Sequence, residues 1–216
     1  MKEKSRIYAK YFKRVLDVFC SGLGMILFFW VYGIIALLVK IKLGSPVIYQ
    51  ASRAGKIDPK TGNEVIFKLY KFRSMTNETD KNGKLLPDTQ RLTKFGRTLR
   101  ATSLDELPEL FNIFKGDMSI VGPRPLSVKY IPYYTDEERH RHDIRPGLTG
   151  LAQVRGRNNL SWEDKFAYDI EYVNKVSFVF DIRIILETVI KVFKRDGIGQ
   201  GEKRPVSLHI ERAGKE

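Results

Sequence analysis

Two adjacent acids, Asp105 and Glu106, stand in the segment RATSLDELPELFNIFKGDMSIVGPRP, which runs from Arg100 to Pro125. Ser103 and Glu106 have the spacing of a capping box, which predicts that a helix begins here. The free N–H groups and the dipole at such a helix start favour an ionised carboxylate and attract phosphate. An ionised carboxylate beside a bound phosphoryl group can act as a nucleophile. The two acids fit equally well a purely structural role as helix caps.

The exact start of this helix depends on Pro108. Proline lacks a backbone N–H and suits only the first turn of a helix. With Ser103 as N-cap, Pro108 lies one residue too deep, whereas with Asp105 as N-cap it fits. The sequence therefore leaves open whether the helix starts at Ser103 or restarts near Asp105.

Several basic residues outside this pair are suited to phosphate. Lys71 and Arg73 end an alternating strand and share one of its faces, so they could hold a diphosphate, although a solvated strand end has the same pattern. Arg124 stands between two prolines in a Gly-Pro-Arg-Pro turn, which favours a rigid bidentate phosphate contact. Arg145 lies with Arg155 and Arg157 in a glycine-rich stretch, DIRPGLTGLAQVRGRNN, that fits an anion-binding loop.

The elements that must position these residues are a hairpin and several helices. VIYQAS, DPKTGN and VIFKLYKF predict a β-hairpin from residue 47 to residue 72. Residues 76–90 are polar and predict a surface loop. Residues 91–103 predict a basic amphipathic helix that lies on a membrane surface or packs on the core. Ser161-Trp162 starts a further predicted helix, which contains Asp169.

The C-terminal part predicts one apolar helix and a tail. FVFDIRIILETVIKVF has the pattern of a helix with a single polar stripe formed by Arg183, Glu187 and Lys191. Its apolar side suits either the core or a membrane. The tail after Lys194 is polar, and we expect it to be loosely ordered.

Charge and composition limit the partners. The 216 residues include 38 basic and 25 acidic ones, a net charge of +13, so we expect a polyanionic partner: nucleic acid, an anionic membrane or a phosphorylated substrate. No recognised nucleic-acid-binding motif is present. Cys20 is the single cysteine, which excludes an intrachain disulfide. His140, His142 and His209 lack metal-ligand spacing, and the first two lie in a charged run predicted to be solvated.

The N-terminal region predicts a membrane segment. Val18 to Val39 contains no charged residue and as one helix would extend roughly 33 Å, enough for a bilayer core. Basic residues flank it on both sides and prefer the cytoplasmic side. A re-entrant hairpin satisfies both flanks, and a true span is the alternative. The bend is expected at one of three glycines: Gly22, Gly24 or Gly33.

Five stretches resemble the bacterial sugar transferase family, the monotopic phosphoglycosyl transferases: KRVLDV, KLYKFRSM, FGRTLRATSLDELPELFNIFKGDMSIVGPRP, RHDIRPGLTGLAQVRGRN and SWEDKFAYDIEYV. They occur in order over most of residues 12–192. Without a long extension before them, the chain is similar to the small members, such as the bacillosamine phosphotransferases. The resemblance and the patterns together predict a helix-dominated α+β fold. Residues 1–43 would form the membrane segment, 44–194 a cytosolic catalytic domain and 195–216 a polar tail.

The resemblance also implies a reaction and its partners. Members move a sugar-1-phosphate from a UDP-sugar to undecaprenyl phosphate and release UMP, as the first membrane step of glycan assembly. The expected location is the bacterial inner membrane, with the catalytic domain facing the cytosol. An N-acetylated hexose donor is favoured and a plain hexose is the alternative. The expected partners are the UDP-sugar, undecaprenyl phosphate and membrane lipid, and a homo-oligomer is left open. A basic, membrane-tethered nucleic-acid-binding protein is the alternative from another class.

The family's site residues map onto positions in this chain. Asp105 matches the nucleophile that forms a covalent phosphosugar intermediate, and Glu106 matches the acid that helps place Mg²⁺; both are predicted metal ligands. The remaining matches are to positions near the substrate: Lys71, Arg100, Arg124, Arg145 and Asp169. In one departure, Phe29-Trp30 stands where the family usually has the Ser-Pro pair that bends the membrane helix.

Overall fold

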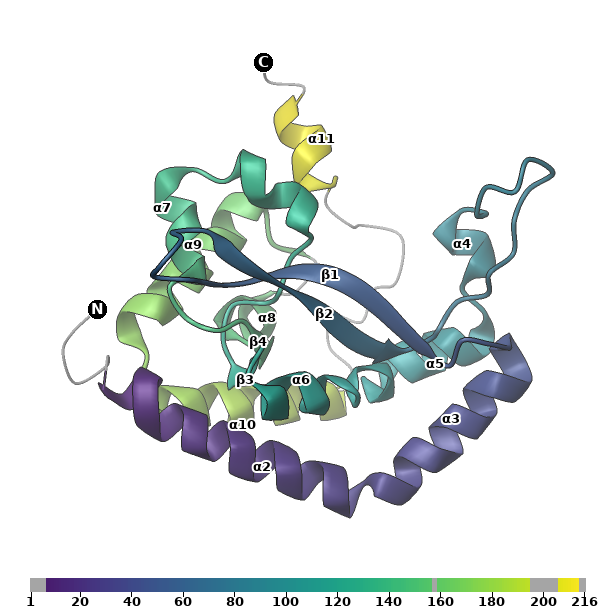
Figure 1. The fold of residues 1–216 in the computed structure, drawn as a ribbon, viewed down its shortest axis with the longest axis horizontal. Helices are drawn as coiled ribbons and strands as arrows, with labels where there is room; N and C mark the ends of the chain where they lie inside the picture. Colours follow the sequence, from purple (N-terminus) through teal and green to yellow (C-terminus); the bar gives the residue numbers. More distant parts are fainter. Residues whose placement is uncertain (1–6, 157–158, 195–205, 214–216) are drawn as a thin grey trace.

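Figure 1 shows the computed structural model, which describes residues 7–156, 159–194 and 206–213. As predicted, the fold is helix-dominated α+β, with a hairpin and one further small sheet among the described residues. Four helices lie along the lower side of the molecule in Figure 1: α2 (Lys13–Leu27), α3 (Phe29–Leu43), α6 (Glu109–Lys115) and α10 (Phe178–Lys194). The sheets and the remaining helices lie above them.

The N-terminal helical segment is broken in its middle. A π-helical turn, η1 (Tyr8–Phe12), leads into α2, and α3 follows after Phe28, which has φ −101° and ψ 11°. The two helices are bent by 64° at this break. Among the described residues, no unbroken helix combines the length and the apolar character needed to cross a bilayer, whereas this bent pair does when taken together.

The bend does not lie at any of the glycines where it was predicted, Gly22, Gly24 or Gly33. It lies at Phe28, where the backbone leaves helical geometry without proline or glycine. The N–H of Phe28 still donates to the carbonyl of Gly24 at 3.0 Å, and the N–H of Tyr32 donates to the carbonyl of Phe28 at 3.1 Å. The break therefore leaves these backbone groups paired inside the protein.

The predicted hairpin is confirmed. β1 (Ile48–Ile57) and β2 (Glu64–Phe72) are antiparallel, with Lys71 opposite Tyr49. Asn112 of α6 fastens this helix to the hairpin: its amide oxygen accepts from the N–H of Tyr70 at 3.0 Å, and its amide nitrogen donates to the carbonyl of Lys68 at 2.7 Å. Because Asn112 is fully buried, these bonds hold α6 against the strand that carries Lys71.

The second sheet joins the Gly-Pro-Arg-Pro segment to the glycine-rich stretch. β3 (Ser119–Val121) and β4 (Gly147–Thr149) are parallel, and the N–H of Gly122 donates to the carbonyl of Thr149 at 2.8 Å. A Cβ on Gly147 would lie 2.1 Å from the backbone nitrogen of Gly122. These glycines thus allow the close approach of two backbone segments.

Helices α8 (Leu151–Arg155) and α9 (Trp162–Lys175) cover this sheet together with α10. α9 starts as predicted, since the Ser161 side chain accepts from the N–H of Asp164 at 3.0 Å. The hydroxyl of Tyr172 donates to Asp181 of α10 at 2.6 Å inside the core. Arg183 and Glu187 pair at 2.9 Å, as the predicted stripe requires.

The segment before Asp105 is less regular than predicted. α4 (Asp88–Arg91) lies at the end of the predicted loop, and α5 (Lys94–Ala101) starts only after Thr93, whose side chain accepts from the N–H of Gly96. Leu99 of α5 is buried in a cluster with α3 and β2. This helix therefore packs on the core and exposes its charges.

Two predictions about the surface were wrong. Residues 195–205 of the tail lie outside the described residues. The following helix α11 (Leu208–Ala213) is folded onto the core: Leu208 is fully buried, and the carbonyl of Val206 accepts from the indole N–H of Trp162 at 2.8 Å.

His142, in the 3-10 turn η4 (His140–His142), is buried rather than solvated. It contacts the carbonyl of Gly55 at 2.9 Å, and burial lowers its pKa to about 3.

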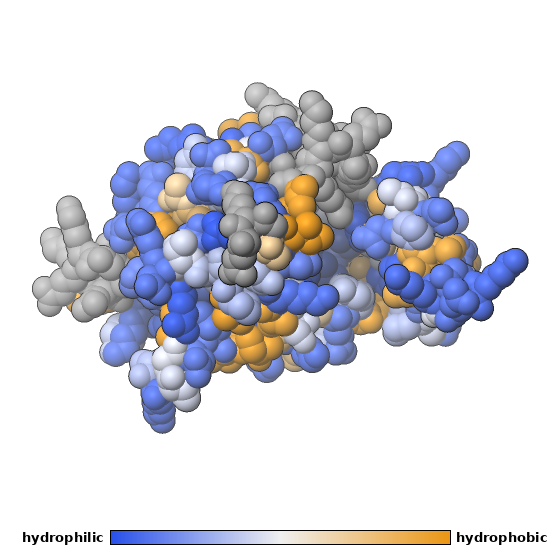
Figure 2. Space-filling model, turned by 90° about the horizontal axis from the view of Figure 1, so that it is seen from above, coloured by the Kyte–Doolittle hydropathy of each residue, from blue (hydrophilic) through white to orange (hydrophobic). Residues whose placement is uncertain are grey.

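The molecule has one apolar side. Large apolar side chains are exposed along three of the lower helices, among them Val15, Phe19, Phe29, Ile41, Val179 and Leu186. Figure 2 looks down on the opposite face, which is predominantly hydrophilic. Exposed apolar side chains along neighbouring helices are typical of a membrane or protein contact.

Candidate active site

Asp105 lies in a short 3-10 turn, η2 (Leu104–Glu106), between α5 and α6. The prediction of a capping box at Ser103 was wrong. Ser103 makes no capping hydrogen bond, and its backbone, with a φ of 56°, is left-handed, whereas an N-cap residue has an extended backbone. α6 begins at Glu109, with Pro108 as its N-cap residue. The turn, rather than a helix end, presents the adjacent acids.

Asp105 is buried, with only 7% of the residue exposed. Burial raises its pKa to about 6, and the nearby charge of Glu106 adds to this shift, while three cations oppose it: Lys71, Arg100 and Arg124. At neutral pH this carboxylate is mostly ionised but poorly solvated. An oxygen in that state is a better nucleophile than a fully hydrated carboxylate.

Glu106 is the centre of an ion-pair cluster. Lys71 Nζ lies 2.6 Å, and Arg124 Nη2 2.7 Å, from the same atom, Glu106 Oε1. Burial alone would raise the pKa of Glu106, but Arg124 and Lys71 outweigh it and lower the pKa to about 2. The structure thus brings together both acids and two of the predicted phosphate-binding cations.

Glu109 belongs to the cluster but was not predicted. Its side chain is 2% exposed, and Lys71 Nζ lies 3.0 Å from its Oε1. Burial raises the pKa of Glu109 to about 7, and the charge of Glu106 adds to the shift. The sequence pattern that could have identified Glu109 is its spacing of three residues from Glu106.

Two contacts hold the loop that carries Arg124. The N–H of Ala54 in β1 donates to the carbonyl of Leu126 at 3.2 Å, and Arg141 Nη2 donates to the carbonyl of Arg124 itself at 2.7 Å. Arg141 in turn forms two hydrogen bonds with Asp169, at 2.9 and 2.7 Å, in a fully buried pair. Asp169 therefore supports Arg124 through Arg141, a residue that the sequence reasoning missed.

Arg100 approaches the site from α5. Its Nε donates to Ser74 Oγ at 2.9 Å, just after β2. A Cβ on Gly96 would lie 1.8 Å from the carbonyl oxygen of Ser74, so only glycine allows the helix to come this close. This contact fixes the distance between Arg100 and the strand that carries Lys71.

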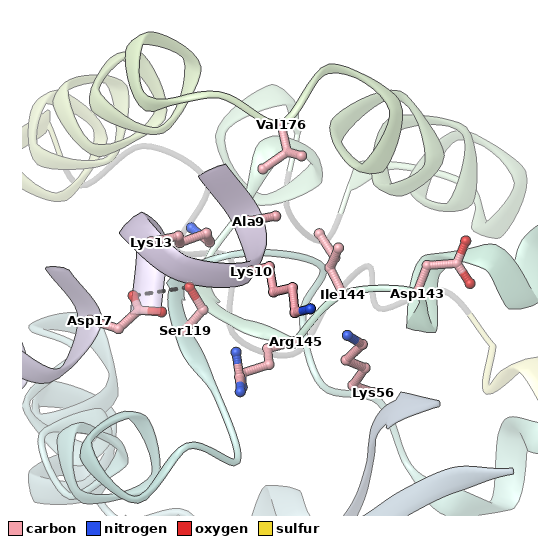
Figure 3. Close-up of a pocket in the computed structure, with 10 residues that line it drawn as sticks. All are labelled: Ala9, Lys10, Lys13, Asp17, Lys56, Ser119, Asp143, Ile144, Arg145 and Val176. Atoms are coloured by element: carbon pink, nitrogen blue, oxygen red, sulfur yellow. Dashed lines mark hydrogen bonds between the residues drawn. The ribbon is translucent and has the colours of Figure 1, made fainter. Parts of the chain in front are cut away.

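The structure places Arg73 and Arg145 in other surroundings. Arg73 donates to the carbonyls of Leu43 and Ser45 and thereby closes the end of α3. Arg145 donates from Nε to the carbonyl of Gly116 at 2.9 Å and lines a separate cavity, shown in Figure 3. The predicted shared face of Lys71 and Arg73 is lost because β2 ends at Phe72.

The arrangement suits a phosphorylated ligand. Cationic groups surround a buried carboxylate, so phosphate oxygens could bind the cations while a carboxylate oxygen faces phosphorus. Among the described residues, no group of three or more His, Cys, Asp or Glu side chains is placed to hold a metal ion by itself.

Comparison with known proteins identifies the family. The family model for bacterial sugar transferases matches residues 8–195. Relatives include the "uncharacterized sugar transferase EpsL" of Bacillus subtilis, which is 51% identical over 75% of this chain and 77% of its own length. The undecaprenyl-phosphate galactose phosphotransferase of Salmonella typhimurium is 37% identical over 88% of this chain, but only 42% of its own length.

A third relative is named for another sugar. The UDP-N-acetylgalactosamine-undecaprenyl-phosphate N-acetylgalactosaminephosphotransferase of Aeromonas hydrophila is 33% identical over 86% of this chain and 44% of its own length. The chain thus spans less than half the length of the Salmonella and Aeromonas relatives. With a family match over nearly all described residues, the chain belongs to the bacterial sugar transferase family.

Proposed function

We propose that the chain is a membrane-bound phosphoglycosyl transferase that moves a sugar-1-phosphate from a UDP-sugar to undecaprenyl phosphate and releases UMP. The observation that carries this proposal is the cluster of Lys71, Glu106 and Arg124 beside the buried Asp105. The relatives that are named for this transfer add support.

In the proposed first step, a carboxylate oxygen of Asp105 attacks the phosphorus that bears the sugar. A bond from Asp105 to phosphorus forms as the bond from that phosphorus to the UMP oxygen breaks, and UMP leaves with its electron pair. In the second step, an oxygen of the lipid phosphate attacks the same phosphorus, and the Asp105 carboxylate is released. Lys71 and Arg124 stabilise the spreading phosphoryl charge in both steps.

Mg²⁺ fits the donor set of this site. Both cations contact Oε1 of Glu106, and no hydrogen bond or ion pair to its Oε2 is found among the described residues. That oxygen and the carboxylate of Asp105 could hold a hard cation whose shell substrate phosphates complete. When bound, the ion supplies charge stabilisation at the diphosphate.

The bent α2–α3 pair supports a re-entrant membrane placement, with the catalytic residues at the cytosolic surface of the bacterial inner membrane. The exposed apolar side chains along the same helices agree with this placement. The nucleic-acid-binding alternative depends on net charge alone.

The test is a UMP-release screen with membranes that contain the protein, Mg²⁺ and polyprenyl phosphate. The panel includes UDP-linked N-acetylated hexoses, UDP-glucose and UDP-galactose, the sugar classes for which relatives are named. We expect release with one donor class and none with Asp105→Asn. Absence of release with every donor, while the protein binds random DNA in a salt-dependent way, would instead favour the alternative.

A further inference from the structure

A second basic cavity lies away from the acid cluster. It has a volume of about 200 Å³, and its basic lining residues include Lys10 of η1, Lys56 of β1 and Arg145, which precedes β4. Lys56 is seven residues along β1 from Tyr49, the partner of Lys71, which at ~3.3 Å per residue is roughly 20 Å. This cavity is therefore a different site from the one that holds Asp105.

The three cations line one cavity without a full set of counter-charges. Figure 3 shows the amino groups of Lys10 and Lys56 pointing toward one another, whereas the Arg145 side chain extends to the other side of the cavity, where its Nε donates to the carbonyl of Gly116. None of the three forms an ion pair within the part of the chain that the structure describes. Burial lowers the pKa of Lys56, and its neighbours Arg145 and Lys10 lower it further, as expected for cations that repel one another.

The acids of the cavity are already engaged. Asp17 accepts from Ser119 Oγ at 3.0 Å and from the N–H of Ile120 at 2.9 Å. Asp143 contacts His140 Nδ1 at 3.0 Å and in Figure 3 points away from the two lysines, although its charge still partly offsets the effect of their repulsion on Lys56. The cavity therefore keeps an excess of positive charge.

The walls of the cavity are fixed in place. Lys13, which also lines it, pairs with Asp181 of α10 at 2.5 Å, and the Tyr8 hydroxyl donates to the same carboxylate at 2.8 Å. Tyr8 also packs edge-on against Phe178. These contacts hold η1 and the start of α2 against α10, so the position of Lys10 is set by a buried network.

Apolar side chains flank the cavity. Tyr11 and Phe12 are exposed beside Lys10 on η1, and Phe178 and Val179 are exposed just after Val176, which lines the cavity. Both pairs lie at the ends of the helices that form the apolar side. An anion that binds here would have apolar protein surface next to it, which suits a phosphate that carries an acyl tail.

We propose that the cavity lined by Lys10, Lys56 and Arg145 binds the phosphate headgroup of an anionic membrane phospholipid. The proposal depends on the membrane placement of α2 proposed above, but not on the transfer chemistry. A bound headgroup would place its negative charge among the three cations and hold the start of α2 at the membrane surface.

The test uses the full chain in dodecyl maltoside micelles, with thermal unfolding followed as palmitoyl-oleoyl phosphatidylglycerol is added. We expect phosphatidylglycerol to raise the Tm, and phosphatidylcholine and inorganic phosphate at equal concentration to leave it unchanged. The double variant K10Q/K56Q should need about 30-fold more phosphatidylglycerol for the same shift, about 5-fold for each lysine.

The matched control is K81Q/K84Q, which removes the same charge from the exposed loop before α4 and should respond like wild type. If the cavity variant fails to fold, K10R/K56R, which keeps the charge, should retain the lipid response. Equal responses of the cavity and control variants, or an equal shift with inorganic phosphate, would overturn the proposal. Asp105→Asn should keep the response, so loss of turnover and loss of lipid binding are distinguishable.

Discussion

Lys71 Nζ lies 2.6 Å from Glu106 Oε1, and this contact joins the end of β2 to the turn that carries Asp105. The hairpin and the acid pair are 35 residues apart in sequence, yet this ion pair and the bonds of Asn112 hold them in one unit. Displacement of either partner would alter the charge next to Asp105.

Lys71→Ala should lower kcat for UMP release by about 100-fold or more, because it removes a donor aimed at the phosphoryl charge. Arg73→Ala, two residues away, should instead lower the free energy of unfolding by about 2 kcal/mol, since Arg73 bonds only to backbone carbonyls at the end of α3 in the structure. Steady-state kinetics and thermal unfolding of both variants check this contrast. A catalytic defect in Arg73→Ala at full stability would return Arg73 to the substrate site.

The value of kcat/KM for UMP release should rise with pH through about 6. The raised pKa of Asp105 leaves its carboxyl group protonated, and not nucleophilic, below that pH. A rate–pH profile from pH 5 to pH 8.5 measures the inflection. Glu109→Gln serves as a control: its own group titrates near pH 7, so the inflection near 6 should persist without it. A flat profile over this range would contradict a raised pKa of Asp105 during turnover.

Asp169→Asn should destabilise the fold by about 3–5 kcal/mol, because it leaves Arg141 buried without its counter-charge. Since Arg141 also holds the carbonyl of Arg124, turnover should fall even at temperatures where the variant is fully folded. Thermal unfolding and single-turnover UMP release separate the two effects. Unchanged stability would show that this buried pair is not needed for the fold.

Both flanks of the α2–α3 pair should be accessible from the same side of the membrane. The test uses single cysteines at Ser5 and Lys42 in a Cys20→Ser background, labelled with an impermeant maleimide in right-side-out and inside-out vesicles. Both sites should react only in inside-out vesicles. Labelling of the two sites from opposite sides would establish a true span and refute the re-entrant arrangement.

The hairpin, the start of α9 and the helix over 178–194 could be predicted because short-range patterns determine them: alternation, a serine N-cap and an apolar periodicity. The bend at Phe28 could not, since neither proline nor glycine stands at the break. Likewise, the left-handed backbone at Ser103 overrode a capping-box pattern that was locally favourable.

Within the site, the acids and Lys71, Arg100 and Arg124 were predicted from residue type and family resemblance. Glu109 and Arg141 were missed because their roles depend on long-range contacts. Glu109 of α6 pairs with Lys71 of β2, and Arg141 bonds to Asp169, which lies 28 residues away in the sequence. The charged run that contains Arg141 suggested a solvated surface, and only the fold shows this side chain to be buried.

The most direct test of the proposed mechanism is to trap the intermediate. The protein is incubated with Mg²⁺ and an isotopically labelled UDP-sugar, without polyprenyl phosphate, then quenched with acid, digested and examined by mass spectrometry. The account predicts that the peptide containing Asp105 gains the mass of one sugar phosphate and loses it when polyprenyl phosphate is added before the quench. An adduct on a different residue, or turnover to lipid-linked product by Asp105→Asn at a near-normal rate, would contradict it.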